Sequence, residues 1–144
     1  MLSMRRKLLA LIWVAAAAAC EGDAARDPAL AYLLDRAHRG FDEAKRLMQK
    51  GEDASFACVP VEDAARELRA KKRTDPSIPE WEKTCGHDAP LAFARATIEK
   101  IEAEKPPRPS SCFALERAVA KLETKLKDDA DVKQVSQKLR TLCP

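Results

Sequence analysis

Apolar residues recur at helical spacing along most of the chain, and no stretch alternates convincingly between apolar and polar at every second position. Spacing by three or four residues places apolar side chains on one face of an α-helix. The clearest stripe comprises Leu30, Leu34, Ala37, Phe41, Ala44 and Met48. We therefore expect an all-α protein, folded as a small helical bundle.

Three helices are expected before residue 86. The first begins at Asp27, a good N-cap residue followed by a proline, and it stops at Gly51. Gly40 interrupts its stripe, which leaves open a kink or a split into two helices. The second helix follows Cys58, and a third, short helix begins at residues 75–76. The inward residues of the third helix are Ile78, Trp81 and Cys85.

Three further helices are expected after a turn at residues 86–87. The proline-rich segment 106–109 forms an extended linker between the fourth and the fifth helix. The expected caps are Asp88 for the fourth helix, Ser110 or Ser111 for the fifth, and Asp128 or Asp129 for the sixth.

The two halves of this pattern resemble each other. Residues 27–32 are similar to residues 88–93, and a Cys-x3-Glu motif at Cys58 recurs at Cys112. Each half also closes with a cysteine. We interpret the pattern as a duplicated unit of three helices. The expected units are residues 27–85 and 88–143, within one helical domain over residues 28–144.

The first 20 residues have the pattern of an export signal. A basic triplet at residues 5–7 precedes an uncharged run over residues 8–19, which is shorter than the roughly 20 residues that span a bilayer. The run ends in Ala17-Ala18-Ala19-Cys20, which resembles the lipobox of bacterial lipoproteins, although that family prefers leucine at the place of Ala17.

This resemblance implies that a signal peptide, residues 1–19, is removed and that Cys20 is acylated. Residues 20–27 would then tether the domain to the membrane, on the periplasmic or exterior side of the cell envelope. Two alternatives remain open at this point. An ordinary signal peptidase site would release a soluble secreted protein, and an uncleaved segment would act as an anchor.

The cysteine count agrees with acylation of Cys20. The chain has five cysteines, so removal of Cys20 from the set leaves an even number for pairing in an oxidising compartment. Within each unit, one cysteine lies at a helix start and the other at the end of the next helix. If these helices form an antiparallel hairpin, both cysteines lie at the same end of it. The expected disulfides are Cys58–Cys85 and Cys112–Cys143, with pairing between the units as the alternative.

The net charge of +3 does not describe the mature chain. Residues 5–7 supply three of the 26 basic residues, while all 23 acidic residues follow residue 20, so the mature chain has equal numbers of both. A neutral domain has no overall field that attracts a polyanion, and we expect no nucleic-acid partner. The basic cluster at residues 69–73 ends a helix, where cations stabilise the helix dipole.

No catalytic residue, metal site or cofactor is expected. The four glycines form no phosphate-binding loop. The Cys85-Gly86-His87 sequence has no second pair of metal ligands nearby, and His38 lies between Asp35 and Asp42 on a face that we interpret as solvated.

The leading hypothesis is a lipid-anchored envelope protein, not an enzyme, that binds another, unidentified envelope protein. The first alternative is a secreted or periplasmic protein that binds a small ligand between its two halves. An uncharacterised enzyme is the third hypothesis, because no catalytic constellation stands out in the sequence. A flat, exposed apolar patch would favour the leading hypothesis, and a solvent-shielded apolar pocket with a few polar groups would favour the first alternative.

Overall fold

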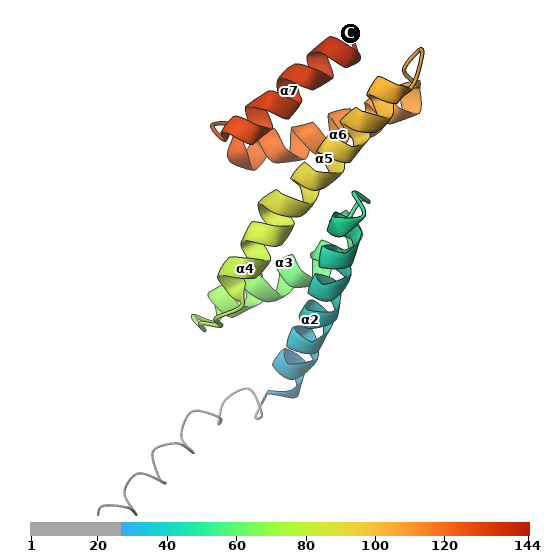
Figure 1. Ribbon diagram of the computed structural model, residues 1–144. Coiled ribbons are helices and arrows are strands. Elements are labelled where there is room, and N and C mark those ends of the chain that lie inside the picture. The colour runs from blue at the N-terminus through green and yellow to red at the C-terminus, as the bar shows by residue number, and fades with distance from the viewer. Residues whose placement is uncertain (1–26) are drawn as a thin grey trace, which may run out of the picture. The chain divides into compact units, whose positions relative to one another are not determined.

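The computed structural model describes residues 27–144, and every regular element in this range is helical (Figure 1). The expected all-α fold is confirmed. Residues Arg36–Pro144 form one compact unit. The signal peptide and the acylated Cys20 lie outside the described residues, so both stay predictions.

The first helix, α2, spans Pro28–Gln49 without a break at Gly40. Asp27 caps it as expected, because its carboxylate accepts a hydrogen bond from the Leu30 N–H at 3.2 Å. Gly51 follows the helix with a φ of +67°, a left-handed conformation that favours glycine. The expected stop is therefore confirmed.

Gly40 allows α2 to approach the next helix, α3 (Ser55–Ala70). A Cβ atom at Gly40 would lie 2.6 Å from the Ala57 carbonyl oxygen and 2.7 Å from the Pro60 Cγ. The absence of a side chain at Gly40 thus allows the two helices to pack closely, and the helix is not split there. α3 also begins three residues before Cys58, at Ser55, whose N–H donates to the Asp53 carboxylate at 2.9 Å. Cys58 lies inside the helix and not before it.

The third and fourth expected helices are one continuous helix. α4 (Ile78–Lys83) runs through a π-helical turn, η2 (Thr84–Asp88), directly into α5 (Ala89–Ala103) (Figure 1). The expected turn at residues 86–87 is wrong, and so is the Asp88 cap, because Asp88 itself has helical backbone angles. Thr84, Cys85 and Ala89 are buried, and this burial holds a weak helix-forming sequence in helical conformation.

The last two helices, α6 (Pro109–Leu126) and α7 (Ala130–Leu142), begin with different caps. The expected serine cap of α6 is wrong. The Glu104 carboxylate, from the preceding loop, accepts hydrogen bonds from the Arg108 N–H at 2.8 Å and the Ser111 hydroxyl at 2.9 Å. Asp129 caps α7 as expected, since its Oδ1 accepts from the backbone N–H groups of residues 131 and 132.

Both expected disulfides are present. Cys58–Cys85 joins α3 to η2 with a Cα–Cα distance of 5.5 Å, and Cys112–Cys143 joins the start of α6 to the residue after α7 with a distance of 5.8 Å. Neither bond connects one expected unit to the other.

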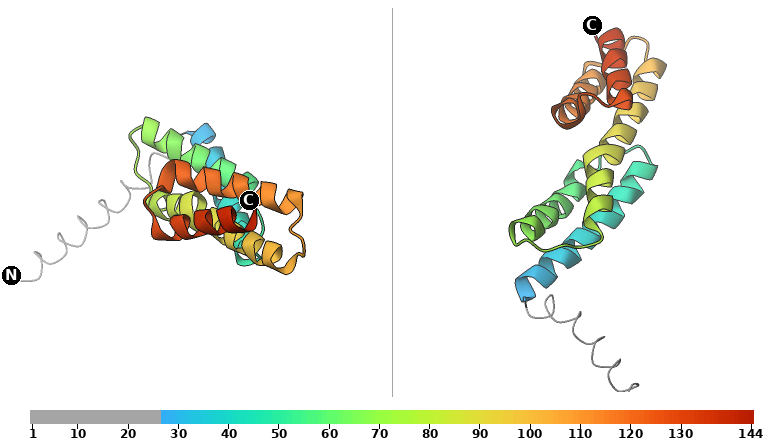
Figure 2. Two further views of the ribbon diagram at one scale, coloured as in Figure 1. Left: turned by 90° about the horizontal axis from the view of Figure 1, so that it is seen from above. Right: turned by 90° about the vertical axis from the view of Figure 1, so that its left-hand side faces the viewer.

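The helices α5, α6 and α7 pack against one another, as both views in Figure 2 show. Their buried core comprises Leu91, Ala94, Ile98, Ile101, Leu115, Ala118, Val119, Leu122, Val132 and Val135. Nearer the N-terminus, α3 packs on α4 and η2, and Trp81 is the largest fully buried side chain, with 1% of its surface exposed. None of the helices in residues 27–144 is long and apolar enough to cross a membrane.

Candidate functional site

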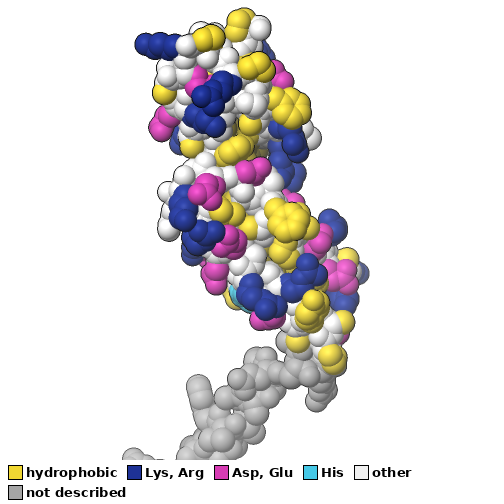
Figure 3. Space-filling model, turned by 90° about the vertical axis from the view of Figure 1, so that its right-hand side faces the viewer, with side chains coloured by type: hydrophobic (Ala, Val, Ile, Leu, Met, Phe, Trp, Pro, Cys, Tyr) yellow, Lys and Arg dark blue, Asp and Glu magenta, His cyan; other side chains and the backbone are white. Residues whose placement is uncertain are grey.

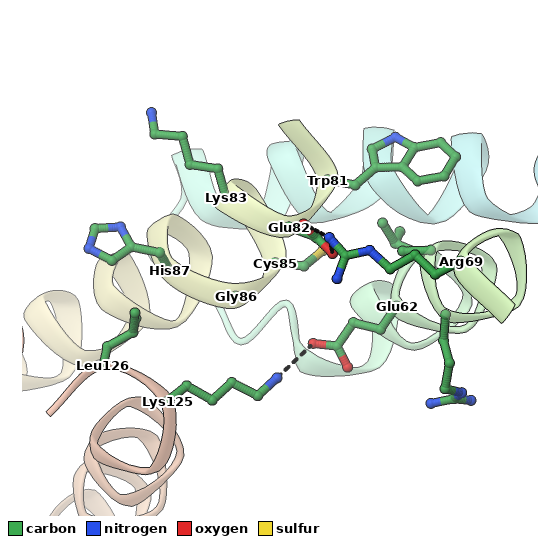
Figure 4. Close-up of a pocket in the computed structure, with 13 residues that line it drawn as sticks. Glu62, Arg69, Trp81, Glu82, Lys83, Cys85, Gly86, His87, Lys125 and Leu126 are labelled. Carbon is green, nitrogen blue, oxygen red and sulfur yellow. Dashed lines mark hydrogen bonds and ion pairs between the residues drawn. The ribbon is translucent and has the colours of Figure 1, made fainter. Parts of the chain in front are cut away.

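An open groove of about 730 Å³ lies between α3, the η2 turn and the end of α6 (Figure 4). We call it the α3–η2–α6 groove. It lies between segments that come from the two expected units. Its apolar lining residues are Val61, Ala65, Trp81, Cys85 and Leu126, and all of them except Leu126 are buried. Its charged or titratable side chains are Glu62, Arg66, Arg69, Glu82, Lys83, His87 and Lys125.

Ion pairs fix most of the charged side chains along the groove. Arg69 of α3 donates to Glu82 of α4 at 2.7 Å, which connects the two helices across the groove wall (Figure 4). Arg66 pairs with Asp63 on its own helix. Within the basic cluster at residues 69–73, Arg69 pairs with Glu82 and Lys71 with Glu67, which agrees with its structural interpretation.

One charged atom in the groove lacks a hydrogen bond. Glu62 Oε1 is buried and accepts no hydrogen bond, and the Lys125 Nζ lies 3.9 Å away. Figure 4 shows the two side chains pointing toward each other from α3 and α6. The Glu62 side chain as a whole is 39% exposed. A donor brought by a bound molecule can therefore reach its carboxylate.

His87 of η2 lies between two carboxylates. Its Nδ1 is 2.7 Å from Asp88 Oδ1, and its Nε2 is 3.3 Å from Asp129 Oδ2. The hydrogen bond to Asp88, together with the negative charge of Asp129, raises the pKa of His87 above 6.5. The pKa of Asp129 is lowered, chiefly by the hydrogen bond from the Val132 N–H at the start of α7.

Among the described residues, His87, Asp129 and Asp131 bring ligand-type atoms within 4.8 Å of one another. These carboxylates already have partners. Asp131 accepts a hydrogen bond from the Arg95 guanidinium at 2.6 Å, and Asp129 Oδ1 caps α7. We therefore interpret this cluster as an ion-pair network and propose no metal site there.

Three large apolar side chains of α3 and α6 face solvent. Phe56 is 91% exposed, Val59 on the same face of α3 is 47% exposed, and Phe113 of α6 is 59% exposed. The Arg117 guanidinium lies over the Phe113 ring, 5.8 Å from its centre. On the face shown in Figure 3, apolar side chains are interspersed with charged ones and form no continuous patch.

The sequence pattern singled out two histidines, and the structure places them differently. His38 is exposed, as expected for a solvated face, and its ring lies edge-on to Trp81 with centres 5.3 Å apart. His87 was expected in a turn, but it lies in η2, within the continuous helix from Ile78 to Ala103, and it lines the groove. Sequence reasoning missed the Glu62–Lys125 and His87–Asp129 contacts, because they join residues far apart along the chain.

Comparisons with protein families, curated proteins and solved structures find no match to this chain.

Proposed function

We propose that the chain is a lipid-anchored cell-envelope protein, held at the membrane through acylated Cys20, whose helical domain binds a segment of another envelope protein. The two disulfides support export, because such bonds persist in oxidising compartments outside the cytosol. The small-residue run that ends at Cys20 supports acylation. On this proposal the protein has no catalytic role.

The observation that carries the binding role is an open, partly apolar groove in which Glu62 Oε1 forms an ion pair with Lys125 at 3.9 Å but accepts no hydrogen bond. A protein segment can lie along such a groove, cover the half-buried Leu126, and donate an N–H group to the Glu62 carboxylate, whose side chain is 39% exposed. A hydrogen bond to this charged carboxylate is stronger than one between two neutral groups.

A small-molecule ligand is the second candidate, because the volume of about 730 Å³ falls within the range of about 300–1,000 Å³ that is typical of ligand pockets. Native mass spectrometry of the chain purified under mild conditions distinguishes the two. A co-purifying small molecule that is lost when Glu62 is replaced would favour the second candidate.

The test is capture from an envelope extract by the lipid-anchored chain and by two variants of α3. Glu62→Lys reverses the charge that lines the groove, while Glu67→Lys makes the same change on the same helix at a residue that pairs with Lys71 and does not line the groove. We expect a captured protein that crosslinks to the wild type and to Glu67→Lys but not to Glu62→Lys. Equal capture by both variants, or no specific capture by the wild type, would contradict the proposal.

A further inference from the structure

His87 connects two segments of the fold that are distant in sequence. Its Nδ1 faces Asp88 within η2, and its Nε2 faces Asp129, the residue that caps α7. An imidazole donates hydrogen bonds from both nitrogens only when it is protonated. The neutral ring can donate to one of these carboxylates and must present a lone pair to the other.

We infer that His87 is a pH-dependent clamp: the protonated ring holds the start of α7 against η2, and the neutral ring releases it. This inference goes beyond the binding role and does not depend on it.

The other charged groups near His87 are paired with one another, so protonated His87 is the cation that faces Asp129. Asp88 has a second cation, Lys83 of α4, at 3.4 Å from its Oδ2. Asp131 of α7 is paired with Arg95 of α5. Asp129, by contrast, has its one ion pair within residues 27–144 with His87.

The groove brings further charged groups toward His87 from the other packed helices. Lys125 at the end of α6 pairs with Glu62 of α3, and Arg66 and Arg69 of α3 pair with Asp63 and Glu82. Each of these cations has its own carboxylate. Loss of the His87 proton therefore leaves the Asp129 Oδ2 without an ion-pair partner among residues 27–144.

The same Asp129 carboxylate performs two tasks. Its Oδ1 caps α7 through the N–H groups of Asp131 and Val132, and its Oδ2 faces His87. When His87 becomes neutral, Asp88 and Asp129 stay negative on either side of an uncharged ring. The restraint on the carboxylate that caps α7 weakens, and we expect the first turn of α7 to open more often.

The direction of the pH effect follows from linkage. A histidine whose pKa is higher in the folded protein contributes its stabilisation fully below the unfolded value of about 6.5 and loses it as the pH rises through the folded value. His87 also lines the groove, so on the function proposed above the clamp would set one wall of the binding site. That extension rests on the proposed function, whereas the titration of His87 does not.

The experiment is an NMR titration of the disulfide-bonded protein, which is direct because the chain has two histidines and His38→Gln assigns them. Amide hydrogen exchange at Asp131 and Val132, corrected for intrinsic rates, is measured at about pH 5.5 and about pH 8, on either side of the histidine range. We expect His87 to titrate above 6.5 and the corrected exchange to be several-fold faster at the higher pH.

Two variants separate the clamp from a structural role of the residues. His87→Gln should give exchange at the α7 start that no longer depends on pH in this range. Asp129→Asn keeps a side-chain oxygen that can cap the helix but removes the charge, so the His87 midpoint should fall. A wild-type His87 midpoint at or below 6.5, or exchange that is equally pH-dependent in His87→Gln, would overturn the inference.

Discussion

Replacing Gly86 by alanine probes the continuous helix from Ile78 to Ala103. A Cβ atom at Gly86 would meet no atom within 4 Å, and the backbone there is not left-handed. At such a position a Gly→Ala change stabilises a protein by about 0.4–1 kcal/mol, because the unfolded chain loses conformational freedom. We expect the melting temperature to rise by about 2–4 °C in a domain of this size.

The sign of this change separates the helix from a turn. If Gly86 sat in a left-handed turn between two helices, alanine would instead destabilise the protein by about 1–2 kcal/mol. Gly40→Ala is the matched control, because its new Cβ would lie 2.6 Å from the Ala57 carbonyl oxygen. The overpacking cost of about 1–3 kcal/mol is set against a helix-propensity gain of about 1 kcal/mol, so Gly40→Ala should be destabilising by up to about 2 kcal/mol.

The assay is urea and thermal unfolding followed by far-UV circular dichroism, with the disulfides intact and both variants compared with the wild type. Equal slopes of unfolding free energy against urea would show that the same folded and unfolded states are compared. A less stable Gly86→Ala protein, or a more stable Gly40→Ala protein, would refute the reasoning.

Three further predictions concern single residues. Trp81→Ala removes the largest fully buried side chain and should cost about 3–5 kcal/mol in urea unfolding, and a loss below about 1 kcal/mol would show that Trp81 is not a core residue. The hydrogen bond from the Arg108 N–H lowers the pKa of Glu104 in the folded protein. The ionised Glu104 therefore stabilises the fold at pH values above about 4.5, and this stabilisation is lost as the pH falls through the lowered pKa. Glu104→Gln should therefore flatten the acid side of the stability–pH curve, and an unchanged curve would argue against this cap. Lys72 has a left-handed φ of 52° after α3, and Lys72→Gly should raise the unfolding free energy by about 1 kcal/mol, whereas a lower value would contradict this strain.

Features that depend on local sequence were predictable. The apolar spacing of three and four residues predicted the all-helical fold, and Asp27 and Asp129 cap their helices as expected. The preferred disulfide pairing is also confirmed over the alternative of pairing between the units, because short connections make neighbouring helices antiparallel and bring the two cysteines of each pair together.

Features that depend on tertiary contacts were not predictable. Gly86 next to His87 is typical of a turn, yet the burial of Cys85 and Ala89 on either side keeps this stretch helical. The start of α6 is capped by the side chain of Glu104, which lies in the preceding loop. Capping rules consider the residues at the start of the helix itself, so they do not identify Glu104. The sequence led us to expect a pocket between the two halves only as an alternative, and it did not identify the residues that line the groove. The charged residues that pair there are far apart along the chain, so no sequence spacing indicates that they meet.

The most direct test of the account is mass spectrometry of the mature chain purified from the cell envelope and digested without reduction. We expect an N-terminal peptide that begins at Cys20 and carries fatty acyl groups, together with peptides joined by Cys58–Cys85 and Cys112–Cys143. A mature N-terminus elsewhere, or an unmodified Cys20, would contradict the lipid-anchored envelope protein proposed here. A bond between one pair and the other would contradict the fold on which its binding groove is built.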